Sequence, residues 1–195
     1  MAKSLQLIAV FRAALVCAVF NGAPLYATQN ASEISDLCER AALTASRASG
    51  VPLNVLRAIS LTETGRAQKG ETQPWPWTVN MEGAGIWFGA RAPALAYEMT
   101  HHGRGARSFD VGCFQINFRW HGDAFASIED MFDPESNALY AARFLSDLFD
   151  EFGDWSKAAG AYHSRTPKYA KRYQARLSRF LTALGPAPKF VSVDA

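Results

Sequence analysis

A glutamate at the end of a predicted helix is the residue most suited to chemistry in this sequence. The helix is predicted to begin at Pro52 and to end just before Gly65. Glu63 follows Ile59 by four residues, which places it on the buried stripe of the helix and at its C-terminal turn. Burial and the helix dipole both raise the pKa of a Glu side chain, favouring the protonated form that a general acid needs. The alternative is a frayed helix end, from which Glu63 turns to Arg66 or to solvent.

The first 27 residues differ from the rest of the chain. They contain Lys3 and Arg12, no acidic residue and an apolar run over residues 13–20. This composition predicts a signal peptide over residues 1–27, with cleavage near Ala27 and a periplasmic or secreted product. An uncleaved N-terminal anchor is the alternative.

Removal of that segment changes the charge and the cysteine count. The whole chain has 20 Lys and Arg against 18 Asp and Glu, and loss of Lys3 and Arg12 leaves 18 of each. A nearly neutral chain gives no indication of nucleic-acid binding. Cys17 is lost as well, so Cys38 and Cys113 remain. Two cysteines in an exported chain most simply form one disulfide, and two free thiols are the alternative.

Residues 28–185 are predicted to form one mainly α (α+β) domain. Apolar spacing and capping residues predict helices over about 32–49, 52–64, 92–102, 134–152, 155–162 and 167–184. Alternating Trp, Val and Ile residues around a glycine turn predict a small hairpin between Gln73 and Arg91. Residues 108–117 are expected to be irregular or briefly extended. Residues 186–195 are expected to be a disordered tail.

Four separated segments resemble the motifs of the lytic transglycosylases of the soluble-lytic-transglycosylase (SLT) type. Residues 61–66 (Leu-Thr-Glu-Thr-Gly-Arg) resemble the E-S-G motif, and residues 112–117 (Gly-Cys-Phe-Gln-Ile-Asn) resemble G-L-M-Q-I-N. Residues 161–164 (Ala-Tyr-His-Ser) resemble A-Y-N-A-G, and residues 166–169 (Thr-Pro-Lys-Tyr) resemble T-x-x-Y. The resemblance spans about residues 32–184 and implies a lysozyme-like fold, a helical bundle with a small β-hairpin lobe.

The resemblance also implies an activity. Enzymes of this family cleave the β-1,4 bond between N-acetylmuramic acid and N-acetylglucosamine in peptidoglycan and leave 1,6-anhydromuramoyl ends. Glu63 would act first as the acid and then as the base, with neither cofactor nor metal. The resemblance assigns substrate binding to Thr64, Phe114, Gln115, Asn117, Tyr162 and Tyr169.

Each of these binding assignments has a structural alternative. Gln115 and Asn117 could instead stabilise a loop, and the two tyrosines could be core residues. For Tyr173 core packing is the preferred interpretation, and for His163, which replaces the Asn of the motif, a surface position is. Four aromatic residues of the predicted hairpin form either a platform for sugar rings or the core of the small lobe: Trp75, Trp77, Trp87 and Phe88.

Two other functions stay open. A lysozyme-type hydrolase on the same fold would need a second carboxylate to position water, for which Asp110 and Asp123 are the candidates. A wall-binding scaffold without catalysis is the other. His101, His102 and His121 lack the spacing of a zinc peptidase, so no metal site is predicted. The expected partners are peptidoglycan glycan strands and, by resemblance to one branch of the family, a flagellar or secretion assembly. We expect a monomer.

Overall fold

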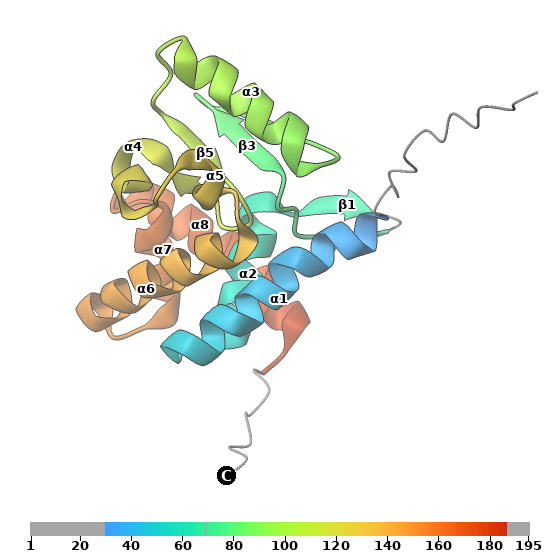
Figure 1. The fold of residues 1–195 in the computed structure, drawn as a ribbon. Helices are drawn as coiled ribbons and strands as arrows, with labels where there is room; N and C mark the ends of the chain where they lie inside the picture. The colour runs from blue at the N-terminus through green and yellow to red at the C-terminus, as the bar shows by residue number, and fades with distance from the viewer. Residues whose placement is uncertain (1–29, 69, 187–195) are drawn as a thin grey trace, which may run out of the picture.

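The computed structural model describes residues 30–68 and 70–186, so the predicted signal peptide and all but the first residue of the predicted tail lie outside it. Eight α-helices, one 3-10 helix and six short strands make up this part (Figure 1). The helices are α1 (Ala31–Ser49), α2 (Leu53–Thr64), α3 (Arg91–Gly103), α4 (Phe118–His121), α5 (Ile128–Met131), α6 (Pro134–Phe152), α7 (Trp155–His163) and α8 (Pro167–Leu184), with the 3-10 helix η1 (Gly122–Ala124). The strands are β1 (Arg66–Gln68), β2 (Glu71–Gln73), β3 (Thr78–Met81), β4 (Ala84–Trp87), β5 (Phe109–Val111) and β6 (Ile116–Asn117). The predicted mainly α class is confirmed.

The long helices begin and end where their capping residues predict. Asn30 and Glu33 form a capping box at the start of α1. Asp133 accepts two backbone N–H bonds at the start of α6, and Gly153 ends that helix in the left-handed conformation. Asp154 caps α7 in the same way. The helical frame is therefore determined largely by local sequence.

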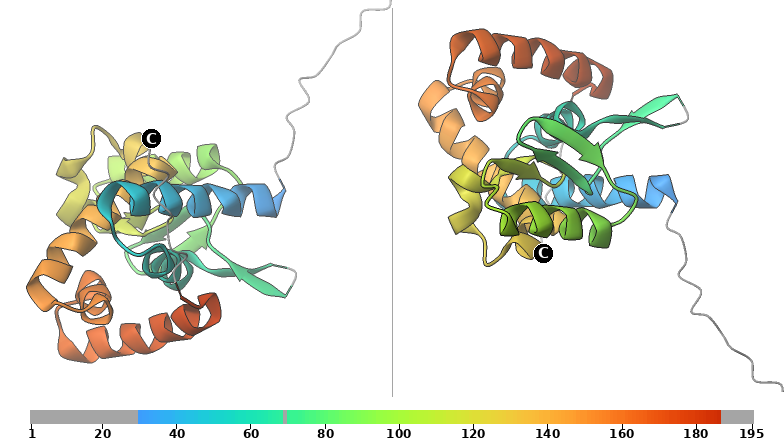
Figure 2. Two further views of the ribbon diagram at one scale, coloured as in Figure 1. Left: turned by 90° about the horizontal axis from the view of Figure 1, so that it is seen from below. Right: turned by 90° about the horizontal axis from the view of Figure 1, so that it is seen from above.

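The helices pack as a bundle beside a small sheet. Helix α1 lies along α6, α2 packs against α8, and α7 joins α6 to α8. Both views of Figure 2 place α8 on one side of α2, with α3 on the opposite side. Residues from α1, α2, α6 and the strands form most of one buried core, to which α8 adds Tyr173 and Leu177. The C-terminal segment of α2 thus lies between the bundle and the sheet.

The predicted hairpin is confirmed and belongs to a larger sheet. Strands β3 and β4 pair antiparallel around a turn at Glu82 and Gly83, both with positive φ. Strands β5 and β6, in the segment expected to be irregular or extended, extend this sheet to the order β4-β3-β5-β6. A second hairpin, β1–β2, was not predicted, because its strands contain polar residues without an apolar alternation.

The start and end of α2 differ in detail from the prediction. Pro52 is the N-cap and not the first helical residue. Gly65 has φ −55°, so it is not a left-handed C-cap. A Cβ at this position would lie 2.3 Å from the Leu61 carbonyl oxygen and 2.8 Å from Thr72 Cγ2. Gly65 is therefore required for a close approach of β2 to the helix end that bears Glu63.

Helix α3 carries a buried acidic side chain, Glu98. Glu98 is completely buried, and neither of its carboxyl oxygens has a hydrogen-bond partner among the described residues. His102 Nδ1 lies 4.0 Å from one of these oxygens. Burial, with the neighbouring charge of Glu129, raises the pKa of Glu98 from 4.5 to about 7.

Glu98→Gln should stabilise the protein above pH 7 and have little effect near pH 4. The native pKa of Glu98 is higher than the unfolded one, so the native state holds the proton more tightly and the unfolding free energy falls as pH rises between them. Gln removes the charge while keeping the shape. Thermal melts at pH 4.0 and pH 8.0 would check this, and a gain in melting temperature that is equal at both values would contradict it.

Candidate active site

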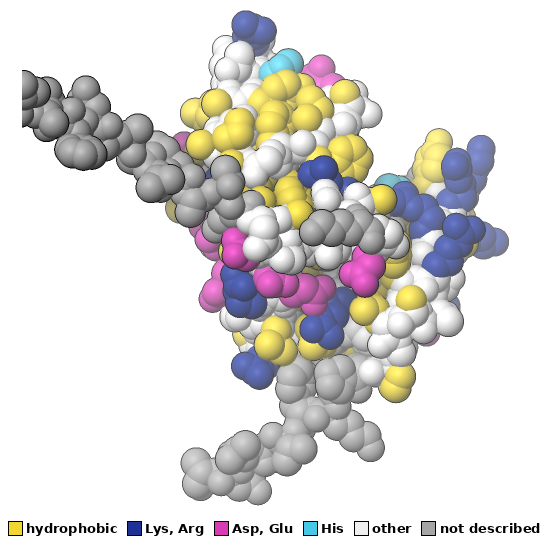
Figure 3. Space-filling view, turned by 90° about the vertical axis from the view of Figure 1, so that its right-hand side faces the viewer, with side chains coloured by type: hydrophobic (Ala, Val, Ile, Leu, Met, Phe, Trp, Pro, Cys, Tyr) yellow, Lys and Arg dark blue, Asp and Glu magenta, His cyan; other side chains and the backbone are white. Residues whose placement is uncertain are grey.

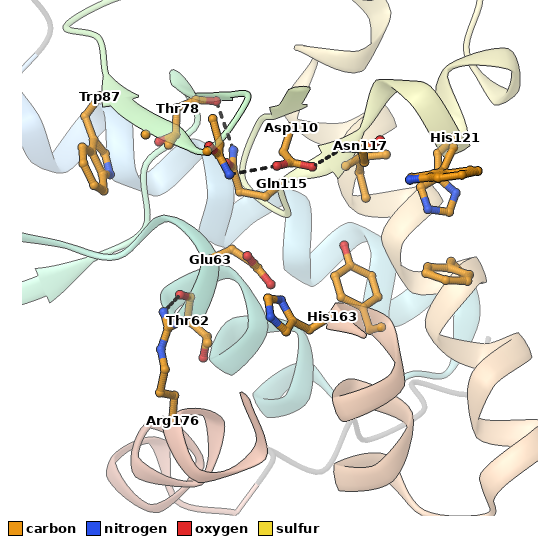
Figure 4. Close-up of a pocket in the computed structure, with 17 residues that line it drawn as sticks. Thr62, Glu63, Thr78, Trp87, Asp110, Gln115, Asn117, His121, His163 and Arg176 are labelled. Carbon is orange, nitrogen blue, oxygen red and sulfur yellow. Dashed lines mark hydrogen bonds between the residues drawn. The ribbon is translucent and has the colours of Figure 1, made fainter. Parts of the chain in front are cut away.

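A pocket of about 520 Å³ opens between the sheet and the helical bundle. Strand and turn residues form one wall, and helices α2, α7 and α8 form the other. Figure 4 shows Asp110, Gln115 and Asn117 on the sheet side, opposite Glu63 and His163. Six of the lining side chains are charged or carry an amide: Glu63, Asn80, Asp110, Gln115, Asn117 and Arg176. The pocket is thus suited to a polar ligand with many hydroxyl and amide groups.

Glu63 projects into this pocket from the last turn of α2. Burial raises its pKa from 4.5 to about 7, the carboxyl of Asp110 adds to the rise, and Tyr173 and Arg176 oppose it. The predicted direction of the shift is confirmed. The alternative contact with Arg66 is not formed, because that guanidinium lies over the Trp75 ring, 4.4 Å from its centroid. Glu63 can therefore be protonated near neutral pH, as a general acid must be.

Asp110 is a second carboxyl group in the same pocket. It accepts hydrogen bonds from Asn117 Nδ2 at 2.7 Å and from Asn80 Nδ2 at 3.0 Å. Burial raises its pKa, and these two amide donors act against the rise. Antiparallel pairing places Asp110 opposite Asn80 on β3 and opposite Asn117 on β6. Sheet register therefore assembles this group from three strands.

Gln115 and Asn117 both line the pocket, as predicted, and both also hold the structure together. Gln115 Nε2 donates to the carbonyl oxygens of Gly112 at 3.0 Å and Thr78 at 3.1 Å. Gln115 also has φ +47°, in the left-handed region. The Oδ1 atom of Asn117 is buried without a partner in the described part of the chain. The alternative prediction, that Gln115 and Asn117 stabilise a loop, is thus correct for their side-chain N–H groups.

Residues 91–178 match the family model described as the Transglycosylase SLT domain. The chain contains an SLT domain. This family has a lysozyme-like fold and acts on peptidoglycan, so the predicted family and fold are confirmed at that level. The match includes Asp110, Gln115, Asn117 and Tyr162, whereas Glu63 lies outside it. The comparisons with curated proteins and with solved structures gave no match.

On α8 the tyrosine that acts on Glu63 is Tyr173 and not the predicted Tyr169. Tyr169 in the first turn of α8 is 50% exposed and does not line the pocket. Tyr173, one turn later, is buried, and its hydroxyl acts on the Glu63 carboxyl and lowers its pKa. The contact falls outside ordinary hydrogen-bond geometry, and the hydroxyl has no other partner in the described residues. The assignment of Tyr169 to the pocket was therefore wrong, whereas Tyr173 is a core residue, as predicted, that also acts on Glu63.

Tyr162 and His163 at the end of α7 both face the pocket. The Tyr162 hydroxyl donates to the Phe114 carbonyl oxygen at 2.8 Å, which ties α7 to the 112–115 turn. The His163 ring stacks on Tyr173, with 4.7 Å between centroids. Burial and the charge of Arg176 lower the pKa of His163, which favours a neutral ring. His163 is exposed, as expected, and it also lines the pocket.

Two predicted binding residues, Thr64 and Phe114, do not reach the pocket. Thr64 is completely buried; its hydroxyl donates to the carbonyl oxygen of Ser60 at 2.9 Å and accepts the Trp75 N–H at 3.0 Å. The Phe114 side chain is buried in the core as well. Both predictions are corrected: Thr64 positions the helix end, and Phe114 contributes its backbone carbonyl to Tyr162.

The aromatic residues of the hairpin divide between core and pocket. Trp75 and Trp77 are buried, whereas Trp87 is 44% exposed and lines the pocket. The Trp87 indole N–H donates to the Thr64 carbonyl oxygen at 2.9 Å, which fixes the ring beside the end of α2. Trp120, 72% exposed, lines the pocket from α4. Sequence reasoning missed Trp120, although it follows Asn117 by only three residues.

The structure forms the predicted disulfide between Cys38 of α1 and Cys113 of the turn before β6. The Cys113 carbonyl oxygen accepts from Ser60 Oγ at 3.1 Å and Thr64 Oγ1 at 3.3 Å. The pocket wall that carries Gln115 is therefore attached to both α1 and α2.

Within residues 30–68 and 70–186 no group of His, Cys, Asp and Glu could hold a metal ion, and no helix is long and apolar enough to span a membrane.

Proposed function

We propose that this protein is a peptidoglycan lytic transglycosylase in which Glu63 is the single acid and base. The observation that carries the proposal is a carboxyl group with a pKa of about 7, placed in a polar pocket that an SLT domain forms in part. Glu63 lies outside the matched family segment, so its role rests on its position and its pKa.

In the first step the protonated Glu63 carboxyl gives its proton to the oxygen that links N-acetylmuramic acid to the next sugar. The C1–O bond breaks, and the N-acetyl oxygen of the muramic acid bonds to C1 in its place. Asp110 lies in the same pocket, where a negative carboxylate stabilises the positive charge that develops on this ring. Trp87 and Trp120 offer exposed ring faces for neighbouring sugars.

In the second step the Glu63 carboxylate takes the proton from the C6 hydroxyl of the same sugar. The C6 oxygen then bonds to C1, the N-acetyl oxygen leaves C1, and a 1,6-anhydro ring results. Glu63 is protonated again, and no water has been consumed. A single carboxyl group with a pKa of about 7 is suited to both proton transfers, because it can hold and release a proton at neutral pH.

The product tests this chemistry directly. Digestion of purified peptidoglycan should release muropeptides about 18 Da lighter than hydrolysis products, because ring closure adds no water. Mass spectrometry of the released fragments measures the difference. Muropeptides with reducing-end muramic acid as the main product would reject the proposal in favour of hydrolysis.

The position of Asp110 favours hydrolysis as the second candidate. A lysozyme-type hydrolase needs a second carboxylate beside the acid, and Asp110 faces the same pocket as Glu63 and raises its pKa. Asp123, the other candidate carboxylate, does not line the pocket. In a hydrolase Asp110 would thus take part in the reaction, whereas in a transglycosylase it would contribute only its negative charge.

Asp110→Asn distinguishes the two candidates. For the transglycosylase we expect the anhydro product to persist, with turnover falling by less than the roughly 10²-fold cost of losing an acid or base. Removal of the Asp110 charge also lowers the Glu63 pKa, so the alkaline limb of the pH profile should move to lower pH. A pH profile with product analysis measures both. Loss of nearly all turnover, with reducing-end products from the wild type, would support hydrolysis.

We also propose that the protein works outside the cytoplasm as a monomer. Its substrate lies in the cell wall, and a disulfide is typical of an oxidising compartment. Recruitment by a flagellar or secretion assembly stays a prediction from the family resemblance.

A further inference from the structure

Helix α8 is strongly basic. Its 18 residues, Pro167–Leu184, include five Lys and Arg and no Asp or Glu. Four of these cations follow one another at helical spacing on one stripe: Lys168, Arg172, Arg176 and Arg179. All four residues are exposed, whereas the buried Tyr173 and Leu177 lie on the neighbouring face of the helix. We call these four residues the α8 basic stripe.

Acidic side chains of the described chain do not neutralise this stripe. The ion pairs in the described residues are Arg57–Glu39, His102–Glu98 and Arg165–Glu151, and none involves the stripe. Figure 3 shows Lys and Arg side chains gathered at the right-hand edge, the side on which α8 lies in that view, while Asp and Glu gather nearer the centre. The stripe therefore offers a positive surface to an external anion.

The stripe is continuous with the pocket through Arg176. This residue lines the pocket, and its guanidinium donates to the Thr62 carbonyl oxygen beside Glu63. It influences the Glu63 charge without forming an ion pair with that carboxyl. Arg176 is also the member of the stripe that follows the buried Tyr173 by three residues. A ligand that is held in the pocket can thus extend along α8 and stay in contact with basic side chains.

We propose that the α8 basic stripe binds the carboxylates of the peptide stem attached to the sugar in the pocket. This inference rests on the proposed function for the identity of the substrate. The sugar rings of the glycan are neutral, so the carboxylates of this substrate lie on its stems. Guanidinium groups match carboxylates in geometry as well as in charge.

The dimensions agree with this occupant. From Lys168 to Arg179 a helix rises about 16 Å, at about 1.5 Å per residue. An extended peptide of about five residues spans up to roughly 17 Å. A stem that starts at the pocket can therefore meet several members of the stripe at once. Such exposed contacts weaken with salt, because mobile ions screen them.

The test compares binding to sacculi that carry stems with binding to glycan strands from which an amidase has removed them. A Glu63→Gln background prevents digestion, and it also lets binding be read if the protein proves to have no lytic activity. We expect Lys168→Gln/Arg172→Gln/Arg179→Gln to weaken binding to stem-bearing sacculi by about threefold to tenfold, as several exposed ion pairs would. The loss should be smaller for stripped strands, which keep only the lactyl carboxylate that the amidase frees on each muramic acid, and it should shrink at high salt.

The matched control removes three exposed cations elsewhere, with Arg40→Gln/Arg104→Gln/Lys157→Gln. This variant has the same net charge as the stripe variant and should bind sacculi like the parent. An equal loss for stripped strands, or an equal loss in the control, would overturn the proposal. Stem-independent binding of the stripe to anionic vesicles or to nucleic acid would overturn it as well.

Discussion

Glu63→Gln should reduce turnover of peptidoglycan by roughly 10²–10⁴-fold, the usual cost of losing an acid or base, while binding persists. Gln preserves the shape and packing of the side chain but can neither give nor take a proton. At pH values above neutral, the free energy of unfolding of the variant should be equal to that of the wild type or higher. The native pKa of about 7 exceeds the unfolded value, so the wild type loses stability as pH rises towards it, and the variant does not.

Turnover is measured by release of soluble muropeptides, binding by co-sedimentation with sacculi, and stability by thermal melts at pH 5 and pH 8. Glu71→Gln is the matched control, because Glu71 is an exposed residue outside the pocket and should tolerate the same change without effect. If Glu63→Gln retains turnover within about threefold of the wild type, the catalytic assignment is wrong, and so is the mechanism that depends on it.

The parts of this fold that the sequence predicts are those governed by local interactions. Asp133, Pro134 and Gly153 specify the ends of α6 through contacts within a few residues, so a single segment contains the information. The raised pKa of Glu63 was predicted from its spacing on the buried stripe of α2, although side chains from distant segments surround it and Asp110 adds to the rise.

The parts that could not be predicted depend on distant segments. Tyr169 and Tyr173 are four residues apart on one helix face, so helical periodicity cannot say which one meets Glu63. Packing of α8 on α2 decides it, because the first turn of α8 stays exposed. Similarly, Asp110 acquires its two amide partners only through the register of β3, β5 and β6. Trp120 follows a predicted motif but belongs to a helix of only four residues, too short for a periodic signal.

Loss of the Cys38–Cys113 disulfide should lower the melting temperature by about 5–20 °C. The bridge joins residues 75 positions apart. A loop of that length corresponds to about 4 kcal/mol in the chain-entropy account, and measured losses are typically about 2–5 kcal/mol. A chain of this size shifts by about 2–4 °C for each kcal/mol. Differential scanning calorimetry with and without reductant measures the change.

Activity near 25 °C should survive this loss better than stability does. The Cys113 carbonyl oxygen keeps its hydrogen bonds from Ser60 and Thr64 on α2 without the bridge, and Tyr162 still holds the next carbonyl. The turn that carries Gln115 therefore stays near Glu63 in the folded molecules. The Cys38→Ala/Cys113→Ala variant should have the same melting temperature as the reduced wild type, and reductant should not change it. Two readily labelled thiols in native protein purified without reductant would contradict the pairing.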